Sequence, residues 1–294
     1  MPVRSVCCSF AIIAVCLATC LLRPLSLQAV DESAKVDSEV SKLLQTFRDE
    51  FVAIKPGTKS FPESFRFGAA DDKLAVDVKL LKPFEISKYE MYQSLYEAVM
   101  GNNPSRWKGS RNSVEQVSYA DAAEFCKKVT ILLRAAKLIE ANQSVRLPTE
   151  VEWEYCARAG TTTRYSFGDE TQNKGDVENL ATLLDPFAWH TGNAAGNDPE
   201  VGVLKPNPWG LYDVHGYLWE LCEGDWSDSV KDVAADPHTP YRNIDTAAAM
   251  AVMRGGSWKD KYTALTSASR VKFPKTTGRD DAVGFRCLLI EDTP

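Results

Sequence analysis

Residues 146–155 read Arg-Leu-Pro-Thr-Glu-Val-Glu-Trp-Glu-Tyr, and no other stretch says as much about the fold. Thr149 stands three residues before Glu152, which is the spacing of a capping box at the start of a helix. The aromatic residues Trp153 and Tyr155 follow at once. The stretch therefore predicts a helix that opens at residues 148–150.

Other elements are predicted on both sides of this helix. Ser118 is expected to cap a helix from Tyr119 to about Ala141, and residues 87–100 form another helix with an aromatic stripe that we assign to the core. Alternating residues and turn signals predict strands at residues 51–54, 74–86, 251–258 and 283–290. Residues 160–210 are rich in Gly, Asn, Asp and Pro but contain aromatic residues. We expect them to be long ordered loops, fixed by metal or by packing.

Six segments in different parts of the chain share one pattern with a known family. They are residues 51–57 (Phe-Val-Ala-Ile-Lys-Pro-Gly), 114–119 (Val-Glu-Gln-Val-Ser-Tyr), 146–155, 210–220 (Gly-Leu-Tyr-Asp, then Gly-Tyr-Leu-Trp-Glu), 254–258 (Arg-Gly-Gly-Ser-Trp) and 284–286 (Gly-Phe-Arg). In this order they resemble the formylglycine-generating enzyme, or sulfatase-modifying factor, family over about residues 50–291. The resemblance implies an α+β fold: a C-type-lectin-like core of short antiparallel strands, a few helices and much irregular loop.

The resemblance also implies a chemistry that this sequence does not carry in full. Active family members oxidise a sulfatase cysteine to formylglycine with oxygen and a copper ion held by two cysteines, which are soft ligands suited to Cu(I). The expected positions of those cysteines fall near Asp260 and Leu265, and no cysteine lies between Cys222 and Cys287. We therefore expect no copper and no catalytic residues of the oxidase type. A branch of the fold that holds iron through about three histidines is not matched either, because the three histidines stand alone in loop-like sequence.

Several site residues follow from the resemblance. Trp219 and Ser257 match residues that line the family's oxygen pocket, and with Asp260 they are expected to line a cleft. Structural calcium is expected on Asp213, the carbonyls of Gly216 and Leu218, and Glu220, since calcium takes six to eight oxygen ligands. A second calcium site is expected to begin at Asn179 and Leu180. Four residues are expected to hold the scaffold through buried ion pairs and hydrogen bonds: Glu152, Trp153, Arg254 and Arg286.

The N-terminus indicates export. Arg4, an apolar run over residues 7–22 and a small residue at Ala29 are typical of a signal peptide cleaved before Val30. An uncleaved anchor and a lipoprotein modified at Cys20 are the alternatives. We divide the chain into a signal peptide (1–29), a polar lead-in (30–49), one folded domain (50–291) and a tail (292–294), and expect a secreted or periplasmic protein with no transmembrane domain in its mature form.

Four cysteines remain after the leader, and an even number in an exported chain suggests disulfides. Spacing alone leaves three pairings open. The family resemblance implies a Cys126–Cys287 bridge, which would leave Cys156 and Cys222 as the second pair.

The chain has a formal net charge of −6 and no basic patch, so nucleic acid is not an expected partner. The function favoured by the sequence is a binding or accessory module for an extracytoplasmic protein, peptide or glycan, with a sulfatase as one candidate partner. The alternative is a divergent enzyme that generates formylglycine on a sulfatase.

Overall fold

The computed structural model describes residues 38–69, 73–243 and 250–292. The signal peptide, its cleavage before Val30, the lipoprotein alternative at Cys20 and the last two residues of the tail lie outside these ranges. Within them, no helix is long and apolar enough to cross a membrane.

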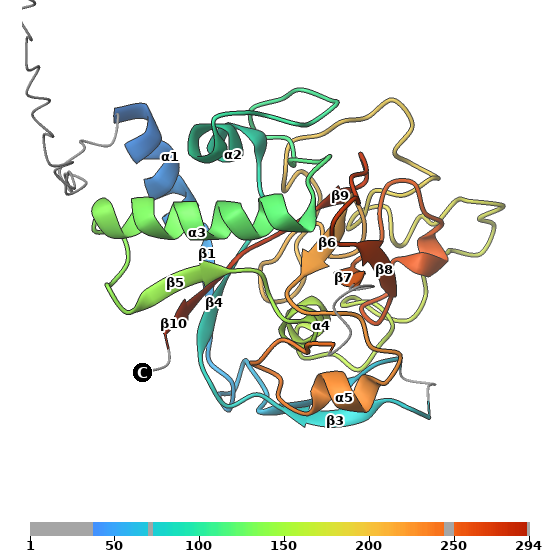
Figure 1. Cartoon of the computed structure of the whole chain (residues 1–294). Helices are drawn as coiled ribbons and strands as arrows, with labels where there is room; N and C mark the ends of the chain where they lie inside the picture. Colours follow the sequence, from blue (N-terminus) through green and yellow to red (C-terminus); the bar gives the residue numbers. More distant parts are fainter. Residues whose placement is uncertain (1–37, 70–72, 244–249, 293–294) are drawn as a thin grey trace, which may run out of the picture. The chain divides into compact units, whose positions relative to one another are not determined.

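Three small sheets organise the described residues (Figure 1). The first is antiparallel throughout, in the order β1 (Phe51–Ile54), β4 (Phe84–Ser87), β10 (Leu288–Glu291) and β5 (Gln143–Arg146). The second has the order β8 (Arg270–Pro274), β7 (Met250–Arg254), β6 (Trp219–Cys222) and β9 (Val283–Gly284), and only its β6–β9 pair is parallel. A hairpin-like pair joins β2 (Ser64–Phe67) to β3 (Val76–Lys79). The predicted α+β class with short, mainly antiparallel strands is confirmed.

For helices α3 and α4, the sequence predicts the first residue more accurately than the last. Helix α4 (Glu150–Arg158) has the full capping box of Thr149 and Glu152, and α3 (Tyr119–Ala135) has one formed by Ser118 and Asp121. Helix α3 stops about six residues before the predicted end, because Lys137 takes a left-handed φ of 56° and the chain turns back. The remaining helices are α1 (Ser38–Asp49), α2 (Gln93–Met100), α5 (Val230–Ala234) and the short η2 (Tyr262–Ala264).

Two predicted boundaries need correction. Helix α2 starts at Gln93 instead of residue 87, because residues 84–87 pair with β1 as strand β4. Helix α1 belongs to the folded domain and not to a lead-in that ends at residue 49. Its side chains Leu44 and Phe47 are buried in the main core, and the Phe47 ring packs edge-on against Phe51 with 4.9 Å between ring centroids.

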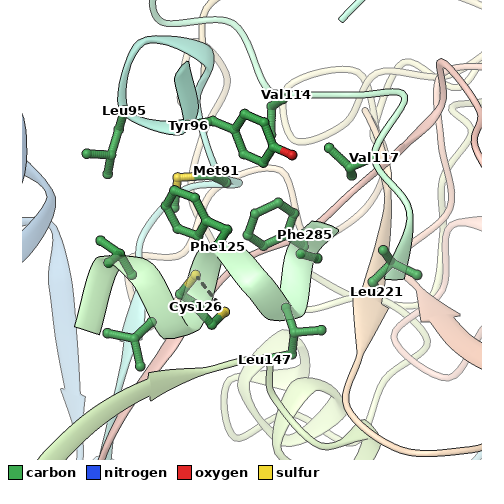
Figure 2. Close-up of a cluster of buried hydrophobic side chains, with 14 of the residues drawn as sticks. Met91, Leu95, Tyr96, Val114, Val117, Phe125, Cys126, Leu147, Leu221 and Phe285 are labelled. Atoms are coloured by element: carbon green, nitrogen blue, oxygen red, sulfur yellow. Dashed lines mark hydrogen bonds between the residues drawn. The ribbon is translucent and has the colours of Figure 1, made fainter. Parts of the chain in front are cut away.

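The main core lies between helices α1, α2 and α3 and the strands beside them. Figure 2 shows its centre, where Tyr96 and Phe125 stack at 5.6 Å and Phe285 meets Phe125 edge-on at 5.4 Å. A second cluster packs around α4, and Trp153 and Tyr155 of this helix are buried in it. Packing also orders the long loop region, as predicted: Phe167 stacks on Phe187 at 4.5 Å within residues 160–210.

Candidate functional site

Buried ion pairs hold the strands and loops around the site. Arg254, at the end of β7, contacts Glu150 at 3.0 Å and also pairs with Glu154, both on α4. Arg286 holds Glu220 through two contacts of 2.6 Å from its Nε and Nη2 atoms. The charges are fully buried, so each would be costly without its partner. This confirms the expected scaffold role of the two arginines.

The other two residues of the expected scaffold are confirmed as well. Trp153 donates its indole N–H to Glu220 Oε2 at 2.7 Å. Glu152 accepts from Arg146 at 2.7 and 2.8 Å and contacts His238 at 3.0 Å. Although burial opposes ionisation, the charge of Arg146 and these hydrogen bonds lower the pKa of Glu152 to about 2.

Two carboxylates of the segment expected to bind calcium, Asp213 and Glu220, already accept hydrogen bonds from the protein. The Glu220 carboxylate already has Arg286 and Trp153 as partners, so a calcium ion bound there would have to compete with a guanidinium. Asp213 is buried and accepts the Gly202 N–H at 2.9 Å. Gly216 has a φ of 127°, and a Cβ at this position would lie 2.5 Å from the Trp189 carbonyl oxygen. Only glycine fits there, whatever the ligand.

The expected start of the second calcium site is exposed. Asn179 and Leu180 lie in a surface turn, and the Leu180 carbonyl accepts from the Gln172 side chain at 2.7 Å. Among the described residues, no group of three or more His, Cys, Asp or Glu side chains is placed to hold a metal ion. The two expected calcium sites, which would use main-chain carbonyl oxygens among their ligands, stay predictions.

The three predicted cleft residues meet at one carboxylate. Asp260 Oδ2 accepts the Trp219 indole N–H at 2.8 Å, the Ser257 N–H at 3.0 Å and the Ser257 hydroxyl at 2.5 Å. Leu265, the other position compared with a copper cysteine, is fully buried, and its side chain lies against Gly256. Trp219, Ser257 and the partly exposed Asp260 therefore form one hydrogen-bonded group.

The four cysteines that lie in the described part of the chain are buried thiols in this structure. The sulfurs of Cys126 and Cys287 lie 3.9 Å apart, at the position labelled Cys126 in Figure 2. A disulfide needs about 2.05 Å, so a modest rotation of the two side chains is required for the predicted bridge. Cys156 and Cys222 share the second core cluster, and the Cys222 sulfur contacts the Glu220 carbonyl at 3.9 Å. The Cys126–Cys287 and Cys156–Cys222 disulfides both stay predictions.

All three histidines make hydrogen bonds in loops, as expected. His190 contacts Asp185 at 2.8 Å, and His238 contacts Glu152. His215 is buried, with Nδ1 3.0 Å from the Leu265 carbonyl and Nε2 close to the Ser166 N–H and hydroxyl. Burial and the charge of Arg158 lower the pKa of His215 to about 4.

A cavity of about 210 Å³ lies next to the hydrogen-bonded group of Trp219, Ser257 and Asp260. The chain neighbours of the predicted cleft residues, Leu218 and Trp258, line it, whereas Trp219, Ser257 and Asp260 are not among its lining residues. Its walls come from loops far apart in the sequence, at residues 107–115, 194–198, 217–218, 258 and 281. Its lining is mainly apolar, with three acidic residues: Glu115, Asp198 and Asp281.

The most unusual group in this cavity is Glu115. Its Oε1 accepts the N–H groups of Arg106 and Trp107, whereas its buried Oε2 has no hydrogen-bond partner. Burial raises the pKa of Glu115, and the nearby charges of Asp281 and Asp198 act in the same direction. A buried unpaired oxygen costs free energy, and Glu115 is a lining residue of the cavity, so its carboxylate is a candidate source of charge for a bound ligand.

The backbone around the cavity is also unusual. Tyr217 has a φ of 76° and Gln116, next to Glu115, has a φ of 61°. Residues other than glycine are uncommon in this region of φ, and such strain often occurs at functional sites. The sequence contained the 114–119 motif, yet nothing in it predicted that Glu115, Trp107 and Trp258 line one cavity.

Comparison with known proteins shows the family to which this chain is similar. A family model described as a sulfatase-modifying factor enzyme 1-like domain matches residues 37–290. A protein named chaperone protein LppX from Paenibacillus barcinonensis is 26% identical over 237 residues, covering 70% of this chain and 77% of that protein. A formylglycine-generating enzyme from Streptomyces coelicolor is 33% identical over 149 residues, which is 48% of this chain and 46% of the enzyme.

Two solved structures share most of the fold. The Treponema denticola variable protein 1 superposes with a TM-score of 0.63 at 26% identity, covering 81% of this chain and 94% of that one. PvdO from Pseudomonas aeruginosa superposes with a TM-score of 0.65 at 23% identity, covering 82% and 94%. At this identity, the similarity to PvdO supports the fold and nothing further.

Proposed function

The chain belongs to the family of proteins with a sulfatase-modifying factor enzyme 1-like domain, and we propose that it is an exported, non-oxidase member that works as a binding or accessory module. Its partner in this proposal is a protein, peptide or glycan outside the cytoplasm. In this proposal the cavity of about 210 Å³ is the binding site, and the protein does not carry out copper-dependent cysteine oxidation.

The observation that carries this proposal is the environment of Asp260. Copper in this family would need two thiolates, and the corresponding positions hold a carboxylate and a buried leucine. The Asp260 carboxylate is already held by three hydrogen bonds from Trp219 and Ser257. These residues do not fit a Cu(I) ion, so we assign no oxidation step to this site.

Two further observations support a binding role. The cavity beside Asp260 combines an apolar lining with a few polar groups, which is the usual composition of a ligand site. One relative that matches over 70% of this chain is named a chaperone protein, which is an accessory role.

Calcium in a structural role remains part of the proposal. Glu90, Asp213 and Glu220 are buried carboxylates near Arg286. Burial raises the pKa of Glu90 well above its usual value and that of Asp213 to about 6, and a calcium ion coordinated by carbonyls and by Asp213 would stabilise their ionised forms.

The test is an oxidase assay on the purified mature protein. A sulfatase-type Cys-x-Pro-x-Arg peptide should stay unmodified in air, with and without added copper, when its mass is followed over time. A known formylglycine-generating enzyme, run on the same peptide, is the positive control. Conversion above the no-enzyme control would support the alternative, a divergent sulfatase-modifying enzyme, and overturn the non-oxidase assignment.

A further inference from the structure

The charges around the cavity of about 210 Å³ are unevenly paired. Asp281 pairs with both Arg106 and Lys259. Glu115 and Asp198 have no cationic side chain among the ion pairs of the described residues. Three carboxylates and two cationic side chains therefore surround the cavity, which leaves an excess of one negative charge when all three carboxylates are ionised.

The acceptor atoms of these carboxylates are nearly all in use. Asp198 accepts from the Asn112 amide at 2.6 Å and lies 3.3 Å from the Tyr217 hydroxyl. Glu115 Oε1 takes two backbone N–H groups, and only its Oε2 is unpartnered. Glu115 is 4% exposed, so this oxygen cannot rely on bulk water. The cavity offers charge, but few free hydrogen-bond acceptors.

Aromatic rings form much of the remaining wall. Trp107, Tyr217 and Trp258 line the cavity together with Leu218 and small residues of the 194–198 loop. A cation close to the face of an aromatic ring is attracted by the ring's quadrupole, and recognition of quaternary ammonium groups uses such rings. Trp107 is 46% exposed, so its ring is open to a ligand at the mouth. The protein's own cations already lie over two of these rings, Arg106 at 4.8 Å from the Trp107 centroid and Lys259 at 5.3 Å from the Trp258 centroid, so a ligand would contact the opposite faces.

The apolar lining and the few free acceptors favour one kind of cation over others. A calcium ion would need six to eight oxygen ligands, which the apolar lining does not provide. A guanidinium has five N–H donors, more than the free acceptors here can satisfy. An ammonium nitrogen whose hydrogens are replaced by alkyl groups needs few or no acceptors and buries its methyl groups against apolar walls. For scale, an apolar cavity of about 150 Å³ admits a benzene molecule.

We propose that this cavity binds an alkylated ammonium group, with Glu115 supplying the opposite charge and Trp107, Tyr217 and Trp258 the aromatic contacts. The inference rests on the proposed binding function and names the chemical class of the ligand. The group can belong to a small molecule such as choline or to a trimethylated lysine side chain.

Calorimetric titration of the full mature chain tests the ligand class. The probes are tetramethylammonium, choline, and 3,3-dimethylbutan-1-ol, which has the shape of choline without its charge. Choline should bind at least about tenfold more tightly than the neutral alcohol, and tetramethylammonium more tightly than butylammonium or methylguanidinium. Equal binding of choline and the alcohol, or tighter binding of butylammonium or methylguanidinium, overturns the proposal, as does the absence of binding by every probe.

Variants locate the site. Glu115→Gln keeps the acceptor for the two backbone N–H groups and should weaken choline binding at least about tenfold. Trp107→Leu, at a half-exposed position, should weaken it about two- to fivefold, the range of an exposed cation–π contact. Asp228→Asn and Trp226→Leu are the matched controls, since neither residue lines the cavity. Unchanged binding in a folded Glu115→Gln protein, or in Trp107→Leu should Glu115→Gln fail to fold, overturns the assignment.

A peptide with trimethyllysine, compared with its unmethylated form, separates the two sources. Preference for the methylated peptide over choline indicates a protein partner, and the reverse indicates a small molecule; either result supports the ligand class. This experiment is independent of the oxidase assay. Choline binding can fail while the sulfatase peptide stays unmodified, in which case only the present inference falls.

Discussion

His215 should make the protein lose stability in mild acid. It is buried, and its hydrogen bonds match a neutral ring that donates from Nδ1 to the Leu265 carbonyl and accepts at Nε2 from Ser166. Protonation of Nε2 would remove that acceptor and bury a charge. The folded-state pKa is therefore lowered from 6.5 to about 4.

The size of the effect follows from this pKa. Between about pH 4 and 6.5 the unfolded chain binds a proton at His215 that the folded chain does not, so stability is fully present above 6.5 and is lost as the pH falls. A fall of the His215 pKa from 6.5 to about 4 corresponds to about 3 kcal/mol of stability lost between pH 7.5 and 4.

The assay is urea unfolding of the wild type and of His215→Asn across this pH range. Asparagine retains a donor for the Leu265 carbonyl but does not titrate. The other titrating groups are common to both proteins, so they cancel in the difference. The wild type should lose about 3 kcal/mol more than the variant on acidification. Parallel pH profiles for the two proteins would refute the neutral, buried state of His215.

Two other outcomes are expected. Peptide mapping without reductant, after export to an oxidising compartment, should link Cys126 to Cys287, and the oxidised protein should be more stable than the reduced one by about 2–4 kcal/mol; a link from Cys126 to any other cysteine contradicts the pairing. Calcium should raise the melting temperature and a chelator should lower it, with magnesium a poor substitute because it demands octahedral geometry. Asp213→Asn should remove most of the calcium effect, and a melting temperature that chelation leaves unchanged contradicts the calcium proposal.

Interactions between near neighbours in the chain were predictable. The capping boxes at Ser118 and Thr149 each join residues three apart, so their geometry depends on local sequence only. The end of α3 was not predictable in this way, because the exposed Lys137 adopts a left-handed conformation that favours glycine, and its residue type gives no sign of that turn. Helix α1 was placed outside the domain because its apolar face has no visible partner in the sequence.

The sequence by itself determined the family, the fold class and the loss of the cysteine pair, because these depend on residue types in a fixed order. It also indicated that Arg254 and Arg286 would be buried in ion pairs. Only the tertiary structure decided which carboxylates they pair with and that Glu115 keeps an unpartnered oxygen at a cavity. The physical reason is distance along the chain. The walls of that cavity extend from Trp107 to Asp281, and side chains so far apart are brought together only when the whole domain packs.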